Sequence, residues 1–171
     1  MAKFLLLILY VIGVGLISLL ILFLPCLFYF NARQKKREML IRQITKFEIK
    51  HHFFGEKMLI AIDQDFSQIC LIELSQIPKG EEKSAERYFN YFTAEEIFQT
   101  KLFQDTLNIE IQLSVINKER AIYYIDFFNL SPNVDFRKFA DTYQRCLKEA
   151  RTWQGYFQIM KQNVPTKFIT K

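Results

Sequence analysis

The 171-residue chain contains few of the residues that interrupt regular structure or build common catalytic centres. It has five Gly, four Pro and three Cys. The scarcity of Gly and Pro argues against long flexible linkers and low-complexity tracts. The sequence contains no zinc-type Cys/His spacing and no HExxH, GxSxG, GxxxxGK[ST] or GxGxxG motif. We therefore expect no catalytic residue, no metal ligand and no cofactor, and we predict that the protein is not an enzyme.

Isolated polar residues do not combine into a chemical site in the sequence. His51 and His52 are adjacent, so on a strand they point to opposite faces and cannot share a metal ion without distortion. Asp63 and Asp65 are expected to form a turn, because the remaining ligands of a calcium loop are missing. Asp126 stands in an otherwise apolar strand. Three roles remain open for it: contact with solvent, a hydrogen bond from the C-terminal helix, or a catalytic carboxylate.

The net charge of +5 is concentrated near the N-terminus. Five cations precede the first acidic residue, Glu38, and removing them from the 23 Lys and Arg leaves 18 against 18 Asp and Glu. A balanced domain lacks the basic field that nucleic-acid binding requires. The aromatic residues of the strands are therefore expected in the core rather than stacked on bases: Tyr88, Phe89, Tyr91, Phe92, Tyr123 and Tyr124.

The three cysteines are Cys26, Cys70 and Cys146. Cys26 lies in the apolar N-terminal segment, Cys70 in a strand-like run and Cys146 on a helical face. We expect Cys70 and Cys146 to be free thiols, as in a reducing compartment, with a disulfide between them as the alternative.

The segment from Phe4 to Phe30 contains no charged residue. Its length exceeds the roughly 30 Å of bilayer hydrocarbon, so residues 1–32 are predicted to form a transmembrane anchor. A cleaved signal peptide is the alternative, but the segment is long and ends without a small-residue cleavage site.

Four cations follow this segment, and they are predicted to lie at the membrane interface: Arg33, Lys35, Lys36 and Arg37. Residues 33–46 are expected to form a basic juxtamembrane helix. The positive-inside rule then predicts a single-pass inner (plasma) membrane protein, with its N-terminus outside and its C-terminal domain in the cytoplasm. Whether these cations only set the topology or also bind anionic lipid headgroups is left open.

Residues 47–162 are predicted to form one α+β domain, followed by a frayed tail at 163–171. Apolar runs and alternation predict six or seven antiparallel strands. The clearest is TLNIEIQLSVI, in which Ile109, Ile111, Leu113 and Val115 face one way. The polar stretch within 76–85 is expected to be an exposed loop. Residues 117–120 are expected to form a turn that leads into the last strand.

The chain then shows helical periodicity. Ser131 and Pro132 resemble an N-cap followed by proline at the first helical position. Apolar residues then recur every three or four positions: Phe136, Phe139, Tyr143, Leu147, Ala150, Trp153, Phe157 and Met160. A long amphipathic helix is predicted here, with its apolar stripe covered by the strands.

This order is similar to the pleckstrin-homology-like fold, a curled antiparallel barrel closed by a long C-terminal helix. The sequence resembles a loose class of bacterial membrane-anchored domains of that type, of unknown function. The resemblance is carried by IAID from Ile60, the strand ICLIEL, the aromatic run YFNYF, the segment EEIFQTKLFQD and Trp153. It lacks the basic first-hairpin loop of phosphoinositide-binding members, because Asp63 and Asp65 stand there. The resemblance implies a binding or scaffold module.

These observations predict a non-catalytic interaction or scaffold module, anchored by a single membrane span and facing the cytoplasm. Its expected partner is a protein, with no nucleic acid and no small-molecule substrate. A subunit of a multi-protein envelope machine of the secretion or conjugation type, with the domain exported, is the alternative function. The third hypothesis is that the protein is an enzyme, and no residue in the sequence supports it.

Overall fold

A computed structural model describes residues 2–116 and 122–164. The chain divides into two compact units, Met1–Arg42 and Gln43–Lys171. The regular elements are α1 (Ala2–Arg42), β1 (Ile49–Phe54), β2 (Met58–Asp63), β3 (Gln68–Glu73), β4 (Phe89–Thr93), β5 (Ile97–Gln104), β6 (Asn108–Val115), β7 (Ile122–Asn129) and α2 (Ala140–Asn163). Four short 3-10 helices connect some of them: η1 (Leu74–Gln76), η2 (Glu82–Tyr88), η3 (Ala94–Glu96) and η4 (Phe136–Phe139).

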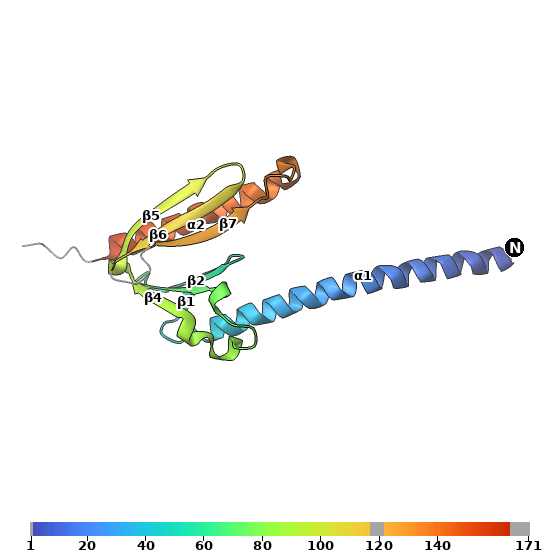
Figure 1. The fold of residues 1–171 in the computed structure, drawn as a ribbon, viewed down its shortest axis with the longest axis horizontal. Helices are drawn as coiled ribbons and strands as arrows, with labels where there is room; N and C mark the ends of the chain where they lie inside the picture. Colours follow the sequence, from blue (N-terminus) through green and yellow to red (C-terminus); the bar gives the residue numbers. More distant parts are fainter. Residues whose placement is uncertain (1, 117–121, 165–171) are drawn as a thin grey trace, which may run out of the picture. The chain divides into compact units, whose positions relative to one another are not determined.

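The first unit is the single helix α1, drawn in blue in Figure 1. The prediction that residues 1–32 form a transmembrane anchor is wrong. Within the described residues, no helix offers a stretch that is both long and apolar enough to cross a bilayer. From Arg33 to Arg42, α1 carries six charged residues, too many for the hydrocarbon of a bilayer: Arg33, Lys35, Lys36, Arg37, Glu38 and Arg42. The single-pass topology and the inner-membrane localisation depended on that span, and both are wrong with it.

The strands of the second unit form two antiparallel sheets. Sheet A has the order β1-β2-β3-β4 and sheet B the order β5-β6-β7 (Figure 1). The α+β composition and the C-terminal helix agree with the sequence, but the curled, closed barrel of a pleckstrin-homology-like fold is contradicted. Among the described strands none of sheet A pairs with one of sheet B.

The sheets separate where β4 passes into β5. There η3 interrupts the extended chain, and a capping box joins Thr93 to Glu96: the Thr93 backbone N–H donates to the Glu96 carboxylate at 2.8 Å. A capping box satisfies backbone donors locally. This turn therefore ends one ladder and begins another.

The two central strands of sheet A, β2 and β3, are buried on both faces, which explains their nearly continuous apolar sequences, whereas the edge strands β1 and β4 include exposed residues. The register pairs Ile60 with Leu71 on one face and Ala61 with Cys70 on the other, and all four residues are fully buried. The first face belongs to the main hydrophobic core. On the second face Phe47 meets the ring of Tyr91 edge-on, with centroids 6.1 Å apart.

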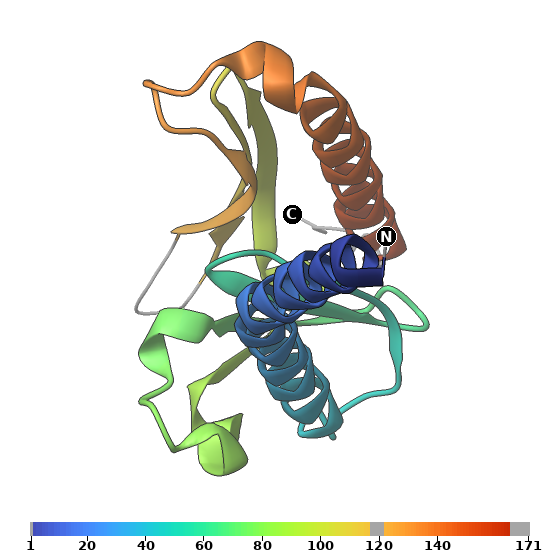
Figure 2. The same cartoon turned by 90° about the vertical axis from the view of Figure 1, so that its right-hand side faces the viewer.

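Helix α2 supplies the third layer of the core. It runs alongside the three strands of sheet B (Figures 1 and 2). The buried residues of α2 match the predicted stripe: Leu147, Ala150, Trp153, Phe157 and Met160. They pack in one cluster with residues of both sheets. Phe53 of β1 stacks on Phe127 of β7 at 4.3 Å, so the two sheets also touch directly.

Two predicted boundaries move in the structure. The polar loop predicted within 76–85 extends further than expected: η2 runs to Tyr88, so the aromatic run YFNYF enters β4 at Phe89. The helix expected at Ser131 begins at Ala140, after η4, whose N-cap is Asp135: its carboxylate accepts a hydrogen bond from the Arg137 N–H at 3.1 Å. The turn at 117–120 and the tail from 165 lie outside the described residues.

Gly55 and Gly155 make a matched test of this packing. A Cβ at Gly55 would lie 3.0 Å from the carbonyl oxygen of Met58 and 3.1 Å from that of Asp126, whereas a Cβ at Gly155 in α2 meets nothing within 4 Å. Gly55→Ala should lower the free energy of unfolding by about 1–3 kcal/mol through overpacking. Gly155→Ala should raise it by about 0.5–1 kcal/mol through helix propensity. Urea unfolding measures both, and equal effects would contradict the close approach at Gly55.

Candidate interaction surface

Sheet B has one face in the core and one face turned away from it. In β6, Ile109, Ile111, Leu113 and Val115 are buried, and the residues between them are half-buried. This confirms the alternation predicted from the sequence. We call the second face the outer face. Following the register across the three strands, it consists of Gln99, Lys101, Phe103, Glu110, Gln112, Ser114, Ile122, Tyr124 and Asp126.

The middle of the outer face combines aromatic rings with a cation. Tyr124 is 46% exposed and Phe103 is 36% exposed. The Lys101 ammonium lies 4.6 Å from the centroid of the Phe103 ring, a cation–π distance. Gln112 lies between Lys101 and Tyr124 in the register. Exposed aromatic side chains with a polar surround are typical of the residues that dominate protein interfaces.

One end of the outer face is acidic. Asp126 lies opposite Glu110 in the register, next to a bulge that turns both Phe127 and Phe128 into the core. The Lys57 ammonium, from the turn between β1 and β2, lies 3.3 Å from the Asp126 carboxylate. Asp126 therefore pairs with Lys57, which was not among the partners considered from the sequence. An ion pair with a cation this exposed adds about 0–1 kcal/mol at most.

The two histidines point to opposite faces of β1, as predicted: His51 lies opposite Ile62 and His52 opposite Ala61. The His51 ring stacks on Tyr156 of α2 with centroids 4.2 Å apart and planes inclined by 13°. Burial, with the nearby charges of Lys50 and His52, lowers the pKa of His51. Within the described residues, no three His, Cys, Asp or Glu side chains gather as a metal-binding group.

Asp63 and Asp65 form the predicted turn. The buried Asp63 carboxylate accepts hydrogen bonds from the Ser67 N–H at 2.8 Å, the Gln68 N–H at 3.0 Å and the Ser67 hydroxyl. The carbonyl oxygen of Asp65 accepts a hydrogen bond from the Asn163 side chain of α2 at 3.1 Å. Both carboxylate oxygens of Asp63 are thus used within the turn.

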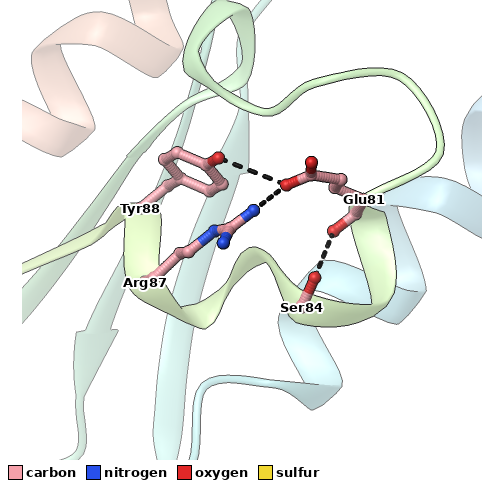
Figure 3. Close-up of polar contacts among 4 residues, drawn as sticks. All are labelled: Glu81, Ser84, Arg87 and Tyr88. Atoms are coloured by element: carbon pink, nitrogen blue, oxygen red, sulfur yellow. Dashed lines mark hydrogen bonds and ion pairs between the residues drawn. The ribbon is translucent and has the colours of Figure 1, made fainter.

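The loop between β3 and β4 has its own polar network (Figure 3). The Glu81 carboxylate pairs with Arg87 and accepts a hydrogen bond from the Tyr88 hydroxyl at 3.4 Å, while the Ser84 hydroxyl donates to the Glu81 carbonyl oxygen at 3.3 Å. All of these contacts lie within one short segment. They hold the loop conformation, and Arg87 and Glu81 are both substantially exposed.

The remaining predicted residues are dispersed. Cys70 and Cys146 are free thiols, as expected, and burial raises the pKa of Cys70 to about 12. Of the aromatic residues expected in the core, Phe89, Phe92 and Tyr123 are buried there, whereas Tyr124 is 46% exposed, so the expectation is wrong for Tyr124. Arg33, Lys35, Lys36 and Arg37 lie on α1, and their role at an interface stays a prediction.

No protein-family model, no curated protein and no solved structure matches this chain. The resemblance to bacterial pleckstrin-homology-like domains therefore stays a prediction, and the closed barrel that it implied is contradicted. The outer face itself could be found in the sequence from the alternation in β6. The pairing of Lys57 with Asp126 could not, because nothing in the sequence places the first hairpin beside the last strand.

The lowered pKa of His51 predicts a pH-dependent stability. A histidine whose pKa is lower in the folded state binds more protons when the chain unfolds, so folding stability rises with pH through this window. The contribution is complete above the unfolded pKa of about 6.5 and is lost as the pH falls toward the folded value. His51→Phe keeps a ring against Tyr156 and should flatten this dependence, whereas His52→Phe removes only the smallest of the three causes that lower the pKa of His51 and should flatten it less. Urea unfolding at several pH values measures the slopes, and equal slopes in both variants would contradict the assignment.

Proposed function

We propose that residues 43–164 form a non-catalytic protein-interaction module, and that the outer face of sheet B binds the partner protein. The observation that carries this proposal is the exposed pair of rings, Tyr124 and Phe103, on either side of the β6 side chains. Aromatic residues are the commonest energetic centres of protein interfaces. They also lie on a sheet whose other face packs against α2 and the core, so little order must be gained on binding.

The side chains of Asp126, Asp63 and His51 already contact other residues of the chain, which supports binding rather than catalysis. Asp126 is paired with Lys57, the Asp63 carboxylate is saturated by its own turn, and His51 is stacked on Tyr156. A catalytic centre needs such groups to converge on a space where a substrate can reach them. The balanced charge after residue 37 favours a protein over nucleic acid as the partner.

The outer face suits a partner with a central apolar contact and a polar rim. Tyr124 offers a ring with a hydroxyl group, and Lys101 lies on the far side of Gln112 from it. Glu110 and Asp126 give one end of the face an acidic character. A partner surface with an apolar centre and a cation placed toward Glu110 would be complementary. Membership of an envelope assembly stays a prediction, because no contact in the described residues favours it.

Photo-crosslinking of the full chain tests the proposal in the cells that produce it. A photoreactive phenylalanine analogue at Tyr124 should give one adduct of defined mass. The same analogue at Ile159, which is 39% exposed on α2, should not. With the partner identified, Tyr124→Ala should weaken binding at least tenfold, or about 1.4 kcal/mol. Ile159→Ala should change it less than twofold.

Two outcomes contradict this assignment. If no adduct forms at Tyr124, or if the same adducts form at Tyr124 and Ile159, the outer face is not the binding surface. If Tyr124→Ala binds as tightly as the natural chain, the aromatic pair is not the energetic centre. Thermal unfolding of both variants provides the folding control, since neither side chain belongs to the core cluster.

A further inference from the structure

The four sheet edges differ in how they are protected. β1 has six residues and an irregular register after Ile49, and β4 has five residues. The β1–β2 turn lies against β7. Gly55 approaches the backbone of Asp126, and Lys57 forms an ion pair with the Asp126 side chain. β5 has eight residues, no proline and one charged side chain, Lys101. Short length, bulges, charges and cover are the features that normally prevent edge pairing. β5 has one irregularity, between Ile97 and Gln99, and its pairing with β6 is regular from Gln99 to Gln104.

The hydrogen-bond pattern shows which groups of β5 point outward. The Asp105 N–H donates to the Asn108 carbonyl oxygen at 2.9 Å, and the Ile116 N–H donates to the Glu96 carbonyl oxygen at 2.8 Å. In an antiparallel ladder hydrogen-bonded pairs alternate along the strand. Counted back from Asp105 in steps of two, the residues of β5 whose backbone groups bond to β6 are therefore Phe103, Lys101 and Gln99. The backbone groups of Thr100, Leu102 and Gln104 point away from β6.

A contact from α2 agrees with this assignment. The Lys161 ammonium donates to the carbonyl oxygen of Phe98 at 2.9 Å, so this outward carbonyl group is satisfied. Within residues 2–116 and 122–164, no hydrogen bond is made to the outward backbone groups of Thr100, Leu102 or Gln104. These three residues form a regular edge available for pairing.

We propose that β5 pairs antiparallel with β5 of a second copy of this chain, with Leu102 on the two-fold axis. The inference goes beyond the proposed function, because it concerns the edge of sheet B and not its outer face. In this register Leu102 pairs with its own copy, and Thr100 pairs with Gln104 of the other chain. All outward N–H and C=O groups from Thr100 to Gln104 then find partners, and two three-stranded sheets become one continuous sheet.

Side-chain chemistry favours a second copy in this register. On the outer face Lys101 lies opposite Phe103 of the second chain, and it already contacts its own Phe103 as a cation–π pair. A register with Lys101 on the two-fold axis would instead place two like charges directly opposite each other, which is destabilising. On the inner face the half-buried Leu102, already packed against the core, meets its copy at the axis.

The dimer also leaves room for the helices. Helix α2 packs across all three strands of sheet B. The two copies of β6 would be separated by three strand spacings, about 14 Å. Each α2 keeps its own three strands as its packing surface, on its own side of the β5–β5 seam.

Two variants of the full chain, each with one introduced cysteine, test this register. Both are made in a background with Cys26→Ser and Cys146→Ser, while Cys70 remains because it is buried. Lys101→Cys mixed with Phe103→Cys, each with a different tag, should form a disulfide heterodimer on mild oxidation. Opposed residues of a non-hydrogen-bonded pair have Cα atoms about 4.5 Å apart, within disulfide range. Lys101→Cys alone should not crosslink, because diagonal neighbours lie about 7–8 Å apart.

Sedimentation velocity of Thr100→Pro and Thr100→Ala supplies a second measurement. Proline removes an outward N–H without touching the bonds to β6, so it should yield monomers, whereas the alanine variant should remain dimeric. The proposal is supported by the mixed disulfide together with loss of the dimer in Thr100→Pro only. Self-crosslinking of Lys101→Cys, absence of the mixed disulfide, or a monomeric natural chain would each overturn it.

Discussion

The structure depends on covering the apolar stripe of α2. Five buried residues of this helix share one core with both sheets, and Trp153 also contacts the Phe53 ring of β1. An amphipathic helix without a partner surface would expose this stripe to water, at a cost of about 1.5–3 kcal/mol for each large side chain. Neither sheet alone could bury it, because the cluster takes residues from each of them. The sheets therefore do not need to be joined by strand pairing: the helix and the stacked Phe53 and Phe127 rings hold them together.

This arrangement determines which surfaces remain for function. The central strands β2 and β3 of sheet A are buried on both faces, and the inner face of sheet B packs against α2 and the core. The outer face of sheet B carries exposed rings, and the β5 edge carries outward backbone groups that do not pair with another described strand. Both lie on the same three strands, so a dimer through β5 would place two outer faces side by side. A partner could then contact Tyr124 of both copies, which would increase its avidity.

Most of the domain could be predicted from local sequence patterns, and the errors have identifiable causes. The alternation in β6 and the apolar stripe through Trp153 are predicted correctly, because each depends only on the period of its own element. The closed barrel was wrong because sequence periodicity does not say whether consecutive strands pair, and the capping box at Thr93 interrupts them. The helix start at Ser131 was wrong because Asp135 supplies a competing N-cap. The outer face was partly predictable; the pairing of Lys57 with Asp126, distant in sequence, was not.

The central claim is that two unjoined sheets and α2 form a single cooperative core. Native-state hydrogen exchange in increasing urea measures this directly, by comparing the free energies of opening for amides of Ile60 in β2, Ile111 in β6 and Phe157 in α2. A shared core predicts that the three values converge on the global free energy of unfolding. If the Ile60 amide opened at much lower urea while Ile111 and Phe157 stayed protected, sheet A would be a separate unit and the account would be contradicted.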